Sequence, residues 1–162
     1  MIPEGVKHYL LKSVEGTPIV LRTLLDGFPS DDPIWDQRPD PARFTLREML
    51  AHVADWDVIF LGRIQRTVAE DNPTLPNCDE GRIAIDNDYA AQDPFETLER
   101  LSTNRAALVE YVKSLPDAAY DRVALRPEVG TLSIAMQVTL IAAHDGYHTR
   151  QAAEFSRIPV GK

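Results

Sequence analysis

The chain has 162 residues, of which 44% are hydrophobic and 26% are charged, and its formal net charge at pH 7 is −8. This composition argues against intrinsic disorder and predicts a single compact domain over residues 1–162. The acidic balance, without a run of Lys and Arg, argues against binding to nucleic acids or to anionic membrane surfaces.

The single cysteine, Cys78, excludes an internal disulfide and suits a reducing compartment. The first five residues lack the charged-then-apolar pattern of a signal peptide. The longest uncharged stretch, about residues 129–143, contains Thr, Ser and Gln and is too short to span a bilayer. We therefore expect a cytoplasmic protein that has neither a nucleic-acid nor a membrane partner.

Helical periodicity recurs along the chain, beginning with about residues 4–26. Gly16 and Pro18 lie inside this stretch and predict a kink or a break there. The connection that follows, residues 29–44, carries four prolines and is expected to be an ordered loop.

The second helix has a clear start, because Thr45 and Glu48 form a T-x-x-E capping box. Apolar residues then recur at i, i+3 and i+4 spacing, and the helix is expected to run to about Glu70. Prolines at positions 73 and 76 mark its end.

The third helix is predicted to start at Asp93, which is followed by a proline at the first helical position, and to run until about Leu115. The fourth is predicted to begin near Thr131 or Ser133 and to continue to about Phe155. No alternating β-branched run of useful length appears, so strands are not expected.

Four helices of about twenty residues, each with one apolar stripe, need one another to bury those stripes. The sequence therefore predicts an all-α fold, a four-helix bundle. The connection between the second and third helices, about residues 72–92, is too long for a tight turn. A connection of this length permits a crossover between parallel neighbours.

All four histidines fall within predicted helices, and three of them have a helical phase that bears on function. His144 and His148 are four residues apart and therefore share one helical face, where two imidazoles can bind one ion. His52 lies on the apolar face of the second helix, which is expected to point inward. This spacing permits a metal site but does not demand one, since a lone helical histidine is more often a hydrogen-bonded core or surface residue.

Other metal motifs are absent from the sequence. It contains no C-x-x-C, E-x-x-H or H-E-x-x-H, which argues against a structural zinc site, a di-iron bundle and a zincin. His8 belongs to none of these patterns and is expected at the surface or at a dimer contact.

His52 within the segment 46–56, together with the late H-x-x-x-H pair, resembles the DinB/YfiT-like family of metal-dependent enzymes, whose name is unrelated here to the DNA polymerase. The order of motifs and the helical layout match over nearly the whole chain. The resemblance implies an up-down-down-up bundle with a long crossover between helices two and three, and a homodimer. It also implies one divalent metal ion, bound by His52, His144 and His148.

Three neutral imidazoles would leave the ion its full charge and an open position, as in catalytic centres. Such ligands suit Zn, Ni, Fe or Cu, and we expect Zn, Ni or Fe. The family includes bacillithiol S-transferases and mycothiol-dependent maleylpyruvate isomerase, which implies transfer of a low-molecular-weight thiol cosubstrate to a small electrophile. The alternatives are hydrolysis through metal-bound hydroxide and a non-catalytic bundle with a structural metal.

Residues near the histidines in sequence can assist them. Asp55, one turn after His52, can orient a ligand imidazole or act as a base, with a solvated helix aspartate as the alternative. Gln151, one turn beyond His148, can reach the site. Asp145 points about 100° away from its neighbour His144 and is expected to be solvated or at an interface.

Overall fold

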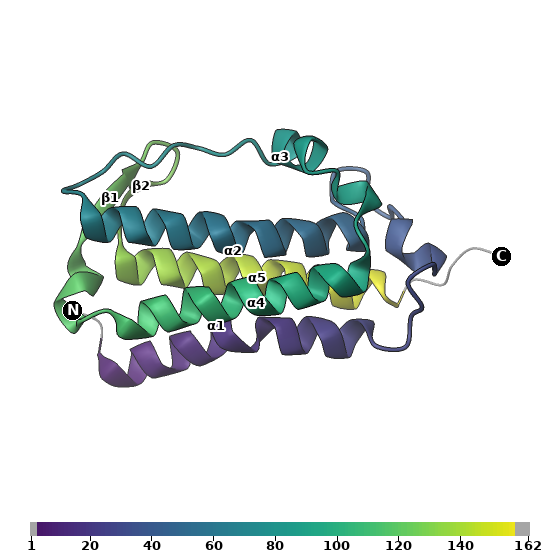
Figure 1. Cartoon of the computed structure of the whole chain (residues 1–162), viewed down its shortest axis with the longest axis horizontal. Helices are drawn as coiled ribbons and strands as arrows, with labels where there is room; N and C mark the ends of the chain where they lie inside the picture. Colours follow the sequence, from purple (N-terminus) through teal and green to yellow (C-terminus); the bar gives the residue numbers. More distant parts are fainter. Residues whose placement is uncertain (1–2, 158–162) are drawn as a thin grey trace.

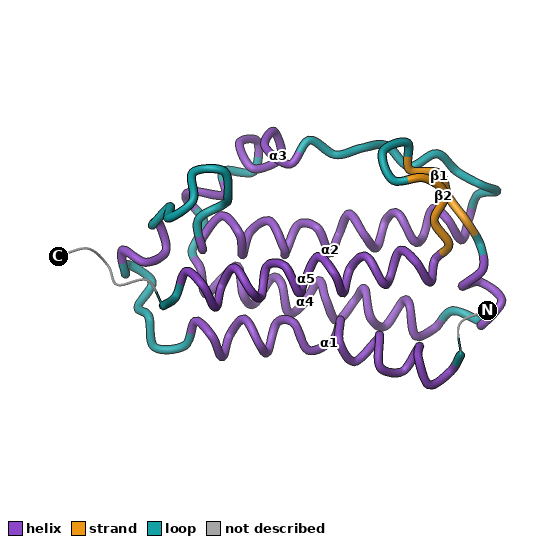
Figure 2. Tube along the Cα trace, turned by 180° about the vertical axis from the view of Figure 1, so that it is seen from behind, coloured by secondary structure: helices purple, strands orange, loops and turns teal. Residues whose placement is uncertain are grey.

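A computed structural model describes residues 3–157, and in that part of the chain four long helices lie side by side (Figure 1). They are α1 (Glu4–Leu25), α2 (Leu46–Ala69), α4 (Pro94–Ser114) and α5 (Ile134–Phe155). Helices α1 and α5 run in one direction, and α2 and α4 run in the other (Figures 1 and 2). The up-down-down-up four-helix bundle predicted from the sequence is therefore confirmed.

The predicted helix starts are confirmed by their hydrogen bonds. Thr45 Oγ1 accepts from the Glu48 backbone N–H at 3.2 Å, and the Glu48 carboxylate accepts from the Thr45 N–H at 2.9 Å. The Asp93 side chain accepts from the first backbone N–H groups of α4. The Ser133 hydroxyl caps α5 in the same way. Each cap satisfies donors that have no partner within the helix.

The parallel pair α2 and α4 requires the chain to return along the length of the bundle. Residues 70–93 make this crossover, which contains the short helix α3 (Glu80–Asp86) and the 3-10 helix η2 (Tyr89–Ala91) and passes over α2 (Figure 1). The sequence predicted the crossover but not these two short helices. Two further 3-10 helices, η1 (Pro33–Asp36) and η3 (Asp117–Asp121), lie in the other connections.

A small hairpin precedes α5, contrary to the prediction that strands are absent. Strands β1 (Val123–Arg126) and β2 (Gly130–Ser133) pair antiparallel, with Val123 opposite Ser133. The backbone of Leu125 also exchanges two hydrogen bonds with the start of the crossover, at Pro73 and Leu75. Strands of four residues are too short to produce a periodic signal.

The apolar core is divided into two clusters along the bundle axis. One cluster gathers residues such as Phe60, Leu108 and Val138, and the other gathers residues such as Leu21, Leu50 and Leu101. On α1, α4 and α5, buried polar side chains lie between the two clusters along the sequence, and on α2 the buried His52 and Asp57 lie on either side of the boundary between them. This polar layer contains both an ion network and the three histidines.

The ion network joins all four bundle helices. Arg105 of α4 donates two hydrogen bonds to Asp57 of α2, at 2.9 and 2.8 Å, and also binds Asp145 of α5. Thr17 of α1 donates to the same Asp145 at 2.7 Å. All four side chains are at least 95% buried. Asp145 is therefore not solvated, and the expectation that it lies at a solvated position or an interface was wrong.

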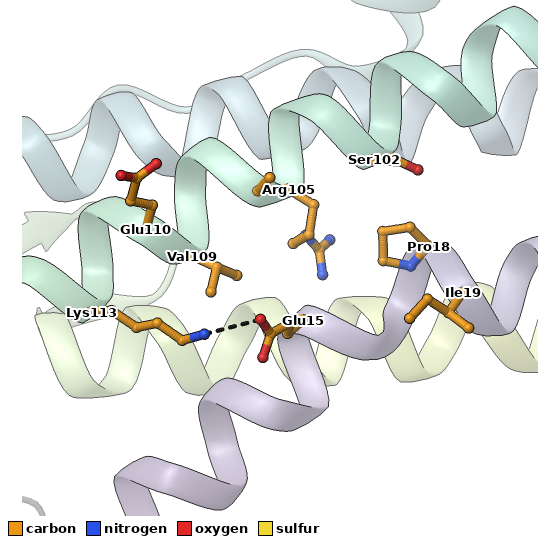
Figure 3. A pocket seen from close by; sticks show the side chains of 9 residues that line it. Glu15, Pro18, Ile19, Ser102, Arg105, Val109, Glu110 and Lys113 are labelled. Atoms are coloured by element: carbon orange, nitrogen blue, oxygen red, sulfur yellow. Dashed lines mark hydrogen bonds and ion pairs between the residues drawn. The ribbon is translucent and has the colours of Figure 1, made fainter.

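Pro18 explains how α1 takes part in this network. It lies inside α1, which remains one continuous helix but changes direction close to Pro18 (Figure 3). A proline cannot donate to the carbonyl four residues earlier, so the Val14 carbonyl loses its helical partner. Arg105 donates to that carbonyl, and Figure 3 shows its guanidinium pointing from α4 towards α1 beside Pro18.

Candidate metal centre

The fold brings the three predicted ligand histidines together in the polar layer. His52 of α2 faces His144 and His148 of α5, and one ring nitrogen from each lies within 4.8 Å of the others. The Nε2 atoms of His52 and His144 are 2.9 Å apart. His52 and His148 are buried, and His144 is partly exposed. His8, by contrast, is exposed near the start of α1, outside this cluster.

Gln151 determines the orientation of His148. Its side-chain N–H donates to the backbone carbonyl of Phe44 at 2.6 Å, so its Oε1 atom is the end that faces His148 Nδ1, at 3.1 Å. Nδ1 of His148 is therefore the protonated nitrogen, and its Nε2 atom keeps a lone pair. The expectation that Gln151 can reach the site is confirmed by this contact.

The donor set fits a cation. Two nitrogens that each lie about 2.0–2.1 Å from one ion are about 2.9 Å apart at a right angle and about 3.3 Å apart at the tetrahedral angle. The Nδ1 atoms of His52 and His144 are buried without a hydrogen-bond partner among residues 3–157, and the nearest carboxylate oxygen to His144 Nδ1, on Asp145, is 3.7 Å away. The Nε2 atoms of His52 and His144 meet only each other, so an ion between them would satisfy their lone pairs, whereas the buried Nδ1 atoms are not part of that contact.

Burial favours the neutral form of His52 and of His148. Burial lowers the pKa of His52 to about 2, with the neighbouring rings of His148 and His144 adding to the effect. Burial and His144 likewise lower the pKa of His148 to about 3. Neutral imidazole is the form that binds a metal ion, so at pH 7 these two side chains bind without first releasing a proton.

Aromatic side chains hold the rings in place. The Phe44 ring lies 5.1 Å and the Trp56 ring 5.4 Å from the His52 ring, measured between centroids. Trp56 and Phe60 pack against His144 at 5.8 and 5.5 Å. Trp56 is itself buried.

A cavity of about 440 Å³ gives access to the histidines. Its walls come from the loop before α2, from α3 and from α5, and they include Arg38, Arg43, Phe44, Glu80, Tyr147 and Gln151 beside the three histidines. Among the described residues that line it, Glu80 is the only carboxylate, and it is exposed. A small molecule in this cavity therefore meets imidazole nitrogens and two arginines.

Asp55 takes no part in the histidine cluster, contrary to the expectation that it orients an imidazole or acts as a base. Its carboxylate accepts from Asn87 at 2.6 Å and from the Tyr89 hydroxyl at 2.9 Å, and it pairs with Arg100 of α4. These contacts attach the crossover to α2 and α4. Residues one turn apart share a helical face only roughly, and Asp55 is rotated towards the crossover.

The thiol of Cys78 lies in the crossover and has a neighbour that the sequence did not identify. Arg63 of α2 donates to Cys78 Sγ at 3.2 Å and to the Pro76 carbonyl at 3.2 Å. Arg63 is buried and packs over Trp56 at 5.2 Å. Arg63 thus helps to fix the start of the crossover against the C-terminal half of α2.

Comparisons with known proteins agree with this architecture. The model of the DinB superfamily matches residues 14–152, so the chain belongs to that family. The solved structure of YfiT from Bacillus subtilis, described as a probable metal-dependent hydrolase with an unusual four-helix bundle topology, superposes with a TM-score of 0.88. The two chains are 20% identical over 97% of this chain and 89% of the other. No curated protein sequence matches significantly.

None of the helices in the described part of the chain is long and apolar enough to cross a membrane.

Proposed function

We propose that this member of the DinB superfamily is a metal-dependent enzyme that holds one divalent ion through His52, His144 and His148. The observation that carries the proposal is the meeting of three imidazole nitrogens within 4.8 Å at the wall of a cavity. An all-imidazole donor set suits Zn, Ni or Fe. When bound, such an ion supplies a positive charge that acidifies a thiol or a water and polarises an electrophile.

We further propose that the reaction is transfer of a low-molecular-weight thiol to a small electrophile. Hydrolases commonly use a carboxylate or imidazole as general base, but Glu80 is exposed and Asp55 is bound to the crossover. A free thiol has a pKa of about 8.5, close enough to neutrality that a nearby positive charge suffices to ionise it. In the transfer, the sulfur forms the new bond to carbon and the thiol proton leaves to solvent. The electrophile either loses its leaving group as the bond to that group breaks, as halide from an aryl halide, or its double bond opens and the neighbouring carbon takes up a proton.

The residues of the chain contribute binding and orientation. The cavity, about 440 Å³, has room for a small thiol and an electrophile of similar size. Gln151 keeps the His148 ring in one orientation, and Phe44 and Trp56 restrain His52. Arg38 and Arg43 line the walls, each paired with a glutamate, and the N–H groups that these pairs leave free can bind anionic reactants.

Hydrolysis is the second candidate. It is favoured by the structural likeness to YfiT, which is described as a probable metal-dependent hydrolase. At 20% identity, that likeness concerns the fold. A bundle whose ion is purely structural is the non-catalytic alternative.

The two reactions are separated by assays on metal-reconstituted protein. Bacillithiol, mycothiol and glutathione are each tested with a chromogenic aryl halide, and a panel of activated esters and amides is tested without thiol. Thiol transfer predicts conjugation that requires metal and disappears in His148→Ala. No metal-dependent conjugation with any of the three thiols would overturn it, and metal-dependent ester or amide cleavage would establish the second candidate instead.

A further inference from the structure

Arg43, in the loop before α2, lines the same cavity as the three histidines. Its guanidinium packs against the rings of Tyr147 and Phe155, at 5.2 and 5.0 Å from their centroids. Nη1 donates to the Glu154 carboxylate at 2.9 Å. The Nε and Nη2 atoms are buried and bond to no group in the described part of the chain.

At Arg47 and Arg105 of this protein the Nε/Nη2 edge is occupied by a carboxylate, whereas at Arg122 it is occupied by two backbone carbonyls. Arg47 binds both oxygens of Asp36 through this edge, at 2.7 and 3.0 Å. Arg105 binds both oxygens of Asp57 through the same edge. The geometry is the parallel pair of N–H···O bonds that makes arginine selective for carboxylates. Arg43 presents this edge without an occupant.

The unused edge belongs to a residue of the cavity wall, and its two donors require an acceptor. A buried donor without an acceptor is costly, and the cost is larger for a charged group. Arg43 has its one protein carboxylate, Glu154, on the other side of the guanidinium, and the cavity is the space from which a second acceptor can come.

We propose that the Nε/Nη2 edge of Arg43 binds the carboxylate of the thiol or of the electrophile, while the reactive end of that molecule reaches the histidines. This inference rests on the proposed function, because it requires a small-molecule reactant in the cavity. It adds a substrate class: reactants that carry a carboxylate. Because the edge is buried, a neighbouring side chain has to move before a carboxylate can reach it. Tyr147 is the candidate, because it lines the cavity and is 43% exposed.

The test uses cobalt-substituted protein and a short series of ω-mercaptocarboxylates, each compared with its neutral amide. Binding of the thiol is followed by the sulfur-to-cobalt absorption band, which does not depend on turnover. The variants are Arg43→Gln, and Arg43→Lys, which keeps the charge beside Glu154 but lacks the two-pronged edge. Arg150→Gln is the matched control, because Arg150 also neighbours Glu154 and Tyr147 but does not line the cavity.

The proposal predicts that the wild type and Arg150→Gln bind at least one acid roughly 10- to 100-fold more tightly than its amide, and that both Arg43 variants lose this preference. Equal binding of every acid and amide by the wild type, or a preference that survives in Arg43→Gln, would overturn it. If cobalt is bound but no thiol gives the absorption band, the proposed thiol transfer is refuted and the Arg43 proposal is tested separately. Calorimetry with the corresponding carboxylates without a thiol then decides the role of Arg43: binding that requires Arg43 supports it, and no binding refutes it.

Discussion

Gln151 accepts a hydrogen bond from His148 Nδ1 at 3.1 Å while its amide N–H donates to the Phe44 carbonyl. The second bond fixes which end of the amide faces the histidine, and therefore fixes the histidine tautomer. Partners of this kind keep a ligand imidazole in the orientation that a metal ion needs. The same residue also connects the loop before α2 to α5, so the histidine cluster and its cavity wall are held together.

Replacing Gln151 tests this connection. Gln151→Leu leaves His148 Nδ1–H without its acceptor and lets the ring rotate, so we expect metal affinity to fall roughly 10- to 100-fold. The measurement is a titration against a competing chelator. Gln137→Leu is the matched control, because Gln137 is also buried on α5 but bonds to Thr67. Equal affinities in the two variants would contradict the role of Gln151.

A variant of Asp55 tests the finding that this residue holds the crossover and does not take part in the histidine cluster. Because its carboxylate binds Asn87, Tyr89 and Arg100, Asp55→Ala is expected to leave the metal content unchanged and to loosen the crossover. Hydrogen exchange measured by mass spectrometry checks this, with faster exchange expected over residues 79–92. Loss of metal with unchanged exchange would restore the role at the site that the sequence suggested.

Removal of Arg105 tests the buried network. Arg105→Met leaves Asp57 and Asp145 buried without their counterion, so we expect the free energy of unfolding to fall by about 3–5 kcal/mol. Urea unfolding measures the change. Arg22→Met is the control, since the Arg22–Glu99 pair also joins α1 to α4 but is exposed, and such pairs contribute about 0–1 kcal/mol. Similar small losses in both variants would show that the network adds little.

Stability of the metal-free protein is expected to depend on pH through the histidines. The lowered pKa of His148, about 3, means that between this value and about 6.5 the unfolded chain binds a proton that the folded chain does not. The free energy of unfolding therefore falls as the pH falls below about 6.5. Each such histidine accounts for a loss of about 2 kcal/mol between pH 7 and pH 5.

Urea unfolding in the presence of a chelator measures this dependence. His148→Gln removes one of the titrating rings, so the loss between the two pH values should be about 2 kcal/mol smaller than in the wild type. An unchanged pH dependence would mean that His148 is already protonated in the folded, metal-free protein.

The helices could be predicted from the sequence because their signals are local. Thr45 and Glu48 mark a start through their spacing alone, and Asp93 and Ser133 act in the same way. The bundle follows from the apolar stripes. The meeting of the three histidines could also be predicted, since His144 and His148 share a helical face, His52 lies on the apolar face of its helix, and the family resemblance joined the three.

The remaining features depend on contacts between distant residues. Arg105 and Asp145 are 40 positions apart, and nothing in either helix shows that they meet in the core. Pro18 leaves the Val14 carbonyl without its helical partner, but the sequence does not show that Arg105 of α4 donates to this carbonyl. Asp55 was misjudged for the related reason that its partners lie in the crossover, whose path no local pattern reveals.

The central claim is tested most directly by the metal content of protein purified without a histidine tag and reconstituted in turn with Zn, Ni and Fe. Inductively coupled plasma mass spectrometry is applied to the wild type, to His148→Ala and to His8→Ala, whose altered residue is exposed and outside the cluster. The account predicts about one ion per chain in the wild type and in His8→Ala, and its loss in His148→Ala. No ion in the wild type, or an equal content in His148→Ala, would contradict it.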